Sequence, residues 1–189
     1  MKILCFGDSN TYGYDPRSYF GSRYPSQYRW VDLLAQKTGC TVMNAGENGR
    51  EIPHRPGELQ NFLQLLSALT PSDLLLIMLG GNDLLQGNSV EITAQRMESF
   101  IRQIPTDRSR IILIGPPRMK NGTWITDPRL LDGCVQLNAA YRRVAETLKT
   151  RFIDEGKWEI ETTFDGVHYS EQGHIAFAEQ LRSALQSIT

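Results

Sequence analysis

Short apolar runs, each ended by glycine or polar residues, recur along the whole chain. Such runs lie at residues 3–6, 40–43, 74–79, 111–114 and 152–153. Their continuous apolar character is typical of strands buried on both faces of a parallel sheet. Apolar residues recur at helical spacing at residues 30–37, 59–69, 92–104, 135–148 and 174–188. This alternation predicts an α/β fold, a three-layer α/β/α sandwich built around a five-stranded parallel sheet.

Length and composition narrow the class of protein. The 189 residues fit one domain, residues 1–189, that is long enough to bury a core. The net charge is −1 and no run of Lys or Arg occurs, so we expect no nucleic-acid partner and no anionic membrane surface as partner. The apolar run 74–79 is too short to span a bilayer and no signal segment is evident, which favours a cytoplasmic protein. The three cysteines are scattered without a CxxC pair, so we expect neither disulfides nor a zinc site, and no cofactor.

Three of the predicted strands end in turns that contain glycine and polar residues. The first is Gly7-Asp8-Ser9, the second runs from Asn44 to Arg50 with two glycines, and the third is Gly80-Gly81-Asn82-Asp83. The carboxyl ends of parallel strands share one edge of the sheet, where ligands bind in open α/β folds. This position makes Ser9 a candidate nucleophile, although a serine after a first strand also suits a phosphate-binding turn or a helix cap.

The sequence contains three histidines, so the search for a general base is short. His54 stands in a proline-bounded loop and is expected to be exposed. His174 is in register with the apolar residues of the last predicted helix and is expected to be packed near its start. His168 follows Asp165 by three residues, and a carboxylate so close can fix the tautomer of the imidazole and stabilise its cationic form. An ordinary surface Asp-Gly turn is the alternative for this segment.

Acyl transfer needs a nucleophile, a base and donors placed where the oxyanion develops. Ser9, Asp165 and His168 supply the first two requirements. The backbone amides of Ser9 and Gly49 and the side-chain amide of Asn82 lie at neighbouring strand ends, where they can converge on one oxygen atom. Removal of one such donor typically costs about 3 kcal/mol of transition-state stabilisation.

These motifs resemble those of a known enzyme family. The chain is similar to the SGNH (GDSL-type) hydrolases, which have a flavodoxin-like α/β/α fold, over residues 3 to about 185. The resemblance lies in four correctly ordered blocks, Gly7-Asp8-Ser9, Asn44 to Gly49, Gly80-Gly81-Asn82-Asp83 and Asp165-Gly166-Val167-His168. Within the family the chain looks most like bacterial arylesterase and acyltransferase members.

The resemblance implies Ser9 as nucleophile, His168 as base and Asp165 as the residue that orients the base. It implies an oxyanion hole made by Ser9, Gly49 and Asn82. The implied activity is hydrolysis of small carboxylic esters, with a small-molecule ester as partner. Carbohydrate acetylesterase and lysophospholipase or thioesterase activities remain open, as does assembly into a homo-oligomer.

Two loops and several single residues are candidates for the substrate pocket. Residues 14–28 and 116–133 lack clear periodicity and are expected to be loops on the substrate side. Asn10 replaces the leucine that often follows the nucleophile in the family, and with Glu47 and Asn48 it is expected to line the mouth of the site. An apolar wall is expected from Tyr12, Met119, Trp124 and Ile125. Polar groups resist desolvation when they have no partners, so Asn10, Glu47 and Asn48 beside the catalytic groups favour substrates with short acyl groups.

Other function classes explain less of the pattern. A flavodoxin-like binding module shares the sheet but has no need of Asn82 or of an Asp-x-x-His turn. A metallohydrolase can recruit Asp8, Asp83, Asp165 and His168, yet these residues show no dedicated metal spacing, so no metal is expected. A catalytically silent carbohydrate-binding relative is the remaining alternative outside the enzymes.

Overall fold

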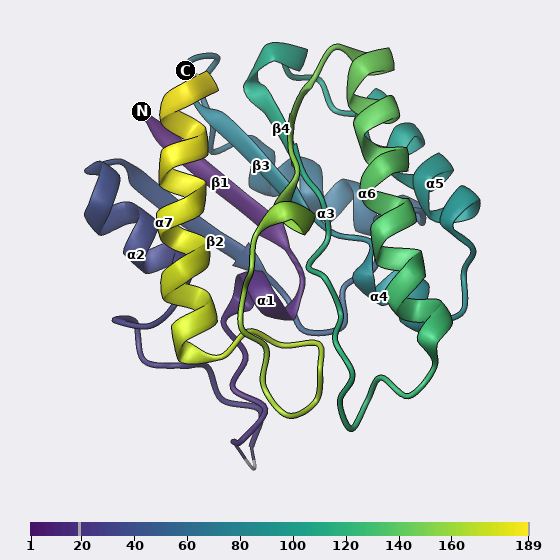
Figure 1. Ribbon diagram of the computed structural model, residues 1–189. Helices are drawn as coiled ribbons and strands as arrows, with labels where there is room; N and C mark the ends of the chain where they lie inside the picture. The colour runs from purple at the N-terminus through teal and green to yellow at the C-terminus, as the bar shows by residue number, and fades with distance from the viewer. Residues whose placement is uncertain (19, 189) are drawn as a thin grey trace.

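A computed structural model describes residues 1–18 and 20–188, and this part of the chain contains one five-stranded sheet (Figure 1). All strand pairs are parallel, and the strand order is β2-β1-β3-β4-β5. The strands are β1 (Lys2–Gly7), β2 (Thr41–Gly46), β3 (Leu74–Met78), β4 (Ile111–Ile114) and β5 (Arg151–Ile153). Gly7 pairs with Gly46 on one side and Met78 on the other, so the first three strands end level at one edge.

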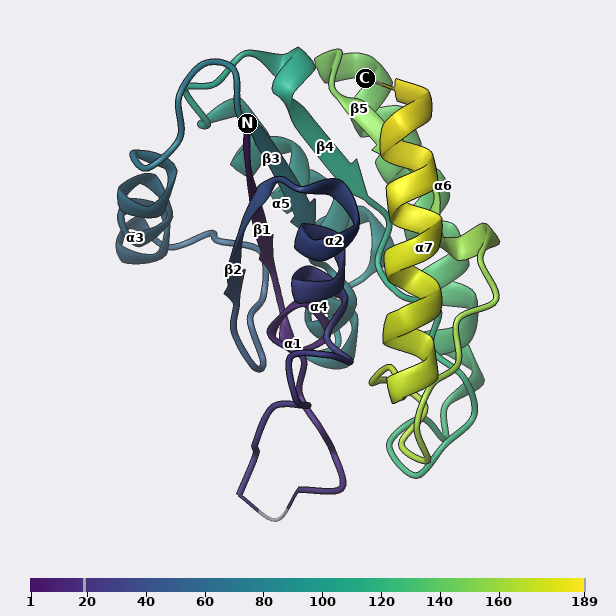
Figure 2. The same ribbon diagram turned by 90° about the vertical axis from the view of Figure 1, so that its left-hand side faces the viewer.

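Helices cover both faces of the sheet and make the predicted three layers (Figure 2). The helices are α1 (Ser9–Tyr12), α2 (Trp30–Thr38), α3 (Pro56–Leu66), α4 (Gly81–Leu85), α5 (Val90–Arg102), α6 (Pro128–Leu148) and α7 (Glu171–Ile188), with 3₁₀ turns at Arg108–Arg110 and Glu155–Lys157. Helices α2 and α7 pack on one face, and α3, α5 and α6 pack on the other. The prediction of an α/β/α sandwich is confirmed.

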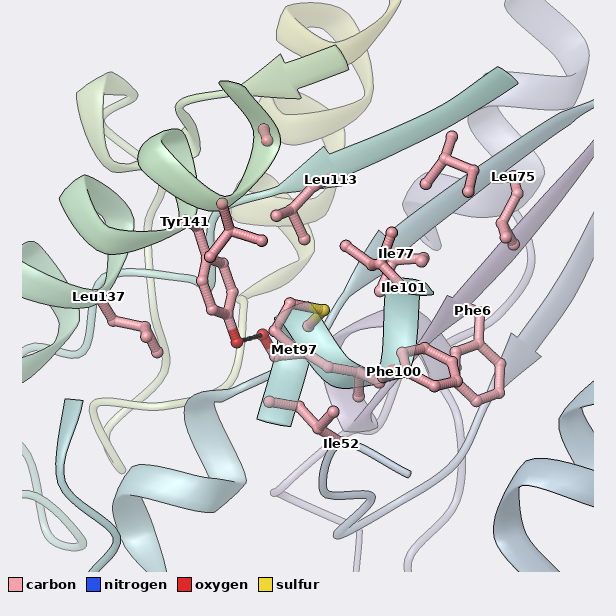
Figure 3. Close-up of a cluster of buried hydrophobic side chains, with 14 of the residues drawn as sticks. Phe6, Ile52, Leu75, Ile77, Met97, Phe100, Ile101, Leu113, Leu137 and Tyr141 are labelled. Carbon is pink, nitrogen blue, oxygen red and sulfur yellow. Dashed lines mark hydrogen bonds between the residues drawn. The ribbon is translucent and has the colours of Figure 1, made fainter. Parts of the chain in front are cut away.

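The two hydrophobic cores follow from the alternation of side chains along the strands. Leu4 and Phe6 face the core under α3, α5 and α6, whereas Ile3 and Cys5 face the core under α2 and α7. Figure 3 shows the first core, in which the rings of Phe6 and Phe100 lie 5.9 Å apart. The central strands β1, β3 and β4 are buried on both faces over almost their whole length, so their sequences contain continuous apolar runs. The edge strands β2 and β5 are only partly buried and carry polar residues as well.

Helix α6 begins earlier than its apolar pattern predicts. The segment 116–133 was expected to be a loop, but residues 128–133 form the first turns of α6. The Asp127 side chain accepts a hydrogen bond from the Arg129 amide and caps the helix, and Pro128 occupies the first turn, where its missing N–H costs nothing. The expected loop is therefore limited to residues 116–127.

No helix within the described ranges is long and apolar enough to cross a membrane. Helices α1 and α4 begin directly after β1 and β3, and both lie at the end of the sheet toward which the strands point (Figure 1). The loops before α6 and α7 reach the same end. The elements that carry the candidate functional residues are thus gathered at the carboxyl edge.

Candidate active site

Ser9, His168 and Asp165 form a continuous hydrogen-bonded series at this edge. Ser9 is the first residue of α1, and the other two lie in the segment that precedes α7. The Nε2 atom of His168 is 2.9 Å from Ser9 Oγ, and its Nδ1 atom is 2.7 Å from Asp165 Oδ2. All three residues are buried. A hydroxyl, an imidazole and a carboxylate in this order can move a proton from the hydroxyl to the ring.

The protonation of Asp165 decides how the ring is used. Burial alone would raise the pKa of this carboxyl, but hydrogen bonds from the His168 ring and from the His168 and Val167 backbone amides lower it to about 2. Asp165 is therefore ionised at neutral pH, and its Oδ2 atom can only accept a hydrogen bond from the Nδ1 atom of His168. The Nδ1 atom of His168 carries that hydrogen in the neutral imidazole, which leaves Nε2 free to accept the proton of Ser9.

The Asp-x-x-His turn is built by the carboxylate itself. Asp165 Oδ1 accepts hydrogen bonds from the Val167 amide at 2.8 Å and the His168 amide at 3.0 Å, so the side chain folds the backbone around it. Gly166 between them has a φ of 81°. This positive φ favours glycine, and the turn brings the imidazole of His168 back onto the other carboxylate oxygen.

The loop before α6 is hydrogen-bonded to the backbone of this turn. The amides of Lys120, Thr123 and Trp124 donate to the carbonyls of Gly166, Phe164 and Asp165 at 2.8, 3.0 and 3.2 Å. Gly122 sits where a Cβ atom would lie 2.3 Å from the carbonyl carbon of Asp165. The loop before α6 therefore packs against the backbone of the Asp165 turn.

Two aromatic rings lie against the imidazole. The Tyr14 ring centroid is 4.7 Å and the Trp124 ring centroid 5.3 Å from that of His168. Trp124 was expected in an apolar wall, and its side chain is 55% exposed, so it stands at the rim of the site. Tyr14 was not identified from the sequence, because an aromatic residue in an aperiodic loop carries no signal of the direction it faces.

Asn10 lines the cavity at Ser9, but its side chain is more deeply buried than the sequence predicts. It was expected at the mouth of the site, but only 3% of its surface is exposed. Its Nδ2 atom donates to the Val167 carbonyl at 3.1 Å, and its Oδ1 atom accepts from the Tyr169 amide at 2.8 Å. The two ends of the side-chain amide therefore hold two backbone groups on either side of His168.

The three predicted oxyanion-hole residues, Ser9, Gly49 and Asn82, lie near one another. Ser9 and Asn82 line a cavity of about 10 Å³ whose walls also include Leu85 and Met119. The Nδ2 atom of Asn82 donates to the Arg50 carbonyl at 3.0 Å, which joins it to the residue that follows Gly49. Only one of the two N–H bonds of this amide is used in that contact.

Glycine is required at two positions of the second turn, Gly46 and Gly49, for different structural reasons. Gly49 has a φ of 74°, which side chains rarely allow. A Cβ atom on Gly46 would lie 2.1 Å from the Tyr12 backbone nitrogen, so this glycine lets β2 approach α1. The sequence prediction of close approach or positive φ in this turn is confirmed for each glycine.

Asp83 is a buried anchor. Its Oδ2 atom accepts from the Ile52 amide at 3.0 Å, and its Oδ1 atom accepts from Arg96 at 3.0 Å. Arg96 also pairs with Glu51 at 3.1 Å. The carboxylate thereby joins α4, which carries Asn82, to the chain that follows the second turn and to α5.

The remaining residues that were expected to line the substrate pocket do not lie together in one pocket. Met119 lines the cavity at Ser9, but Ile125 is 1% exposed and belongs to the hydrophobic core, which corrects the expectation that it forms a pocket wall. Tyr12 is covered by the guanidinium of Arg23, 4.5 Å from its ring centroid. Glu47 and Asn48 line a different hollow of about 260 Å³, together with Gly49 and residues of α3.

The other two histidines are found where the sequence places them. His54 is exposed, and His174 is 1% exposed in the first turn of α7. The Nδ1 atom of His174 is 3.5 Å from the Trp30 amide. Burial lowers the pKa of His174 to about 3, so its ring is neutral in the folded protein at ordinary pH.

The comparison with known families decides the identity. A model described as the GDSL-like lipase/acylhydrolase family matches residues 5–176, which include the Ser9 turn and the Asp165 to His168 turn. The chain belongs to this family. It therefore belongs with ester-hydrolysing enzymes. A sequence search of curated proteins gave no match.

Solved structures share the GDSL fold along almost the entire chain. A protein from Agrobacterium tumefaciens str. C58, provisionally described as an arylesterase, is 26% identical with a TM-score of 0.84, covering 100% of this chain and 99% of that one. A carbohydrate acetylesterase from Sinorhizobium meliloti is 23% identical with a TM-score of 0.81, and the aryl esterase of M. smegmatis is 24% identical with a TM-score of 0.80. Both comparisons cover 100% of this chain and 99% of the other.

Proposed function

We propose that this GDSL-family hydrolase is a serine esterase that cleaves small carboxylic esters, with short acyl or acetyl groups, through an acyl-enzyme. The observation that carries the proposal is the series from Ser9 Oγ to His168 Nε2 at 2.9 Å and from His168 Nδ1 to Asp165 Oδ2 at 2.7 Å. A packing role does not require three buried polar groups of complementary protonation in this order.

In the proposed reaction, Ser9 Oγ attacks the ester carbonyl carbon while its proton passes to His168 Nε2. The carbonyl oxygen becomes an oxyanion and accepts hydrogen bonds from the Ser9 amide, the Gly49 amide and the free N–H of Asn82. Collapse of this intermediate breaks the ester bond, and His168 gives the proton to the departing alcohol oxygen. Water then attacks the acyl-enzyme with His168 again as base, which releases the acid and restores Ser9.

The small cavity beside Ser9 supports a short acyl group. The centre of a water-sized sphere can occupy only about 10 Å³ of this cavity, and Leu85, Pro117, Met119 and Val167 are among its walls. A cavity this small favours the methyl group of an acetyl ester over a longer acyl chain. A longer acyl chain has to displace Met119 or leave the cavity toward solvent.

Carbohydrate acetyl esters are the second candidate. The hollow lined by Glu47, Asn48 and Gly49 is polar and begins at the turn that supplies a proposed oxyanion donor, where a hydroxyl-rich alcohol can find partners. The similar fold of the S. meliloti protein, which is described as a carbohydrate acetylesterase, also supports this substrate class. Lysophospholipase and thioesterase activity are less favoured, because the cavity leaves little room for a long acyl chain.

Active-site labelling tests the proposal. A fluorophosphonate probe should label the wild-type chain once, and p-nitrophenyl acetate should be hydrolysed without added metal and in the presence of EDTA. Ser9→Ala should lose both properties and keep its fold, whereas Ser22→Ala, at an exposed position, should keep both. Labelling or turnover that survives in Ser9→Ala would reject the mechanism, and activity lost in EDTA and restored by a divalent ion would indicate a metallohydrolase. A folded wild-type chain without labelling or turnover would indicate a silent carbohydrate-binding relative.

A further inference from the structure

Glu155 is a buried acid that the proposed mechanism does not use. It follows β5 at the carboxyl edge of the sheet, and 1% of its surface is exposed. Burial raises the pKa of Glu155 to about 8, although the Tyr169 hydroxyl and the Arg118 backbone amide act in the other direction. The carboxyl group is therefore mostly uncharged at neutral pH. An apolar side chain would fill this space at a lower desolvation cost than a carboxyl group. The presence of Glu155 is therefore explained by the polar contact that it makes.

That contact is with the residue that follows His168. The Tyr169 hydroxyl donates to Glu155 Oε1 at 2.9 Å, and Tyr169 is 1% exposed. Its ring packs against Phe177 and His174 of α7, with ring centroids 5.3 and 5.4 Å away. The hydrogen bond to Glu155 holds the hydroxyl end of the Tyr169 side chain in place. The position of this side chain in turn restricts the position of the Tyr169 backbone.

The backbone around His168 is held on every side. Asn10 accepts from the Tyr169 amide at 2.8 Å and donates to the Val167 carbonyl at 3.1 Å. The His168 carbonyl accepts from the Thr163 amide at 2.8 Å. The Tyr169 side chain is a further attachment of this segment, and it ends at Glu155. Loss of that hydrogen bond removes one of the contacts that hold the imidazole close to Ser9.

We propose that Glu155 is a positioning residue, which acts through Tyr169 to keep the His168 imidazole at hydrogen-bond distance from Ser9. The inference rests on the proposed serine esterase function. Displacement of a reacting group by about 1 Å can lower turnover by about 100-fold, so a small movement of this segment has a measurable effect.

Four variants test the proposal, with kcat normalised to the fraction of molecules labelled by the fluorophosphonate. Glu155→Ala should lower kcat by about 10- to 100-fold and change KM by less than about threefold, because the acyl and alcohol contacts are untouched. Glu155→Gln retains an acceptor for the Tyr169 hydroxyl and should restore kcat to within about threefold of wild type. Tyr169→Phe, which keeps the ring, should lower kcat as Glu155→Ala does, and the double variant should lose no more than either single one.

Asp73→Ala is the matched control. Asp73 is also a buried carboxylate, but it lies at the amino end of the sheet, where it accepts from the Lys2 and Thr70 amides at 2.6 and 2.8 Å. Its loss should lower the melting temperature and leave kcat per labelled site unchanged. An equal loss of kcat in Asp73→Ala, or multiplicative effects of Glu155→Ala and Tyr169→Phe, would show a general effect of destabilisation and overturn the proposal.

The outcomes separate this inference from the proposed function. If the wild-type chain is labelled and active but Glu155→Ala and Tyr169→Phe keep their kcat, the positioning role fails alone. If the wild-type chain is neither labelled nor active, the esterase function fails first. Should Glu155→Ala not fold, Tyr169→Phe decides the question, because it removes a single hydroxyl from the core.

Discussion

The Asn10 side chain accepts a hydrogen bond from the Tyr169 amide at 2.8 Å, so the residue after Ser9 holds the residue after His168. The two positions are 159 residues apart in the chain. The same side chain donates to the Val167 carbonyl. One asparagine thus fixes the relative position of the proposed nucleophile and the proposed base.

Asn10→Ala should impair both stability and turnover. The change leaves a buried carbonyl and a buried amide without their partner, at a cost of about 1–3 kcal/mol for each unsatisfied group. It also frees the segment that carries His168, so kcat per labelled site should fall. Denaturant unfolding and active-site-titrated kinetics measure the two effects. Asn88→Ala, which removes a hydrogen bond to the Asp83 carbonyl, is the control and should change stability alone. Unchanged kcat in Asn10→Ala would limit Asn10 to a structural role.

The two buried histidines should respond in opposite ways to alanine. His168→Ala should lower kcat by several orders of magnitude with a small change in melting temperature, because the imidazole carries the proton. His174→Ala removes packed volume between α2 and α7 and should cost about 1–3 kcal/mol of stability, with a smaller effect on kcat of the folded molecules. Thermal melts and kcat per labelled site measure both. A stable but inactive His174→Ala would mean that the wrong histidine has been chosen as base.

His174 should also make the fold sensitive to acid. Its pKa is lowered from 6.5 to about 3, first by burial and then by the nearby His168 and Arg29 charges. Between these pH values the unfolded chain binds a proton that the folded chain does not, so stability falls as the pH drops below about 6.5. His174→Gln cannot titrate, and its free energy of unfolding should fall less than that of wild type between pH 7 and pH 4. The control is His54→Gln at an exposed position, which should follow the wild-type curve; identical slopes for His174→Gln and wild type would contradict the assignment.

Met119 should set the acyl-chain length. The wild-type chain should show its highest kcat/KM on acetyl to butyryl esters and little activity on long-chain lipids. Met119→Ala enlarges the cavity at Ser9 and should raise kcat/KM for hexanoyl relative to acetyl esters by about 10-fold or more, since each added methylene contributes at least about 1 kcal/mol in an apolar pocket. Met43→Ala on β2 is the control and should keep the wild-type preference. A wild-type kcat/KM that rises out to decanoyl would exclude a short-acyl site and leave the roles of Ser9 and His168 untouched.

Much of the fold could be predicted from the sequence. Residues 3–6 of β1 and all of β3 are apolar because both faces of these strands are buried, so the strands can be recognised in the sequence. Parallel pairing then places their carboxyl ends at one edge, so the turn that carries Ser9 and the turn that carries Asn82 had to lie near each other. The contact between Asp165 and His168 could also be predicted from the sequence, because a carboxylate and an imidazole three residues apart can meet within one turn.

The tertiary structure decided which way the remaining side chains face. Asn10 was expected at the mouth of the site and is a buried residue that holds two backbone groups beside His168. Ile125 was expected in a pocket wall and belongs to the hydrophobic core, and Tyr14 lies against His168 without any signal in the sequence. Glu155 follows a strand of three residues and becomes significant only because Tyr169 reaches it. A repeating pattern can fix the buried face of a regular element, since the same geometry recurs at each turn or pleat. The direction of a single side chain in a loop depends on partners far along the chain, and these partners are brought together only when the sheet and its helices have packed.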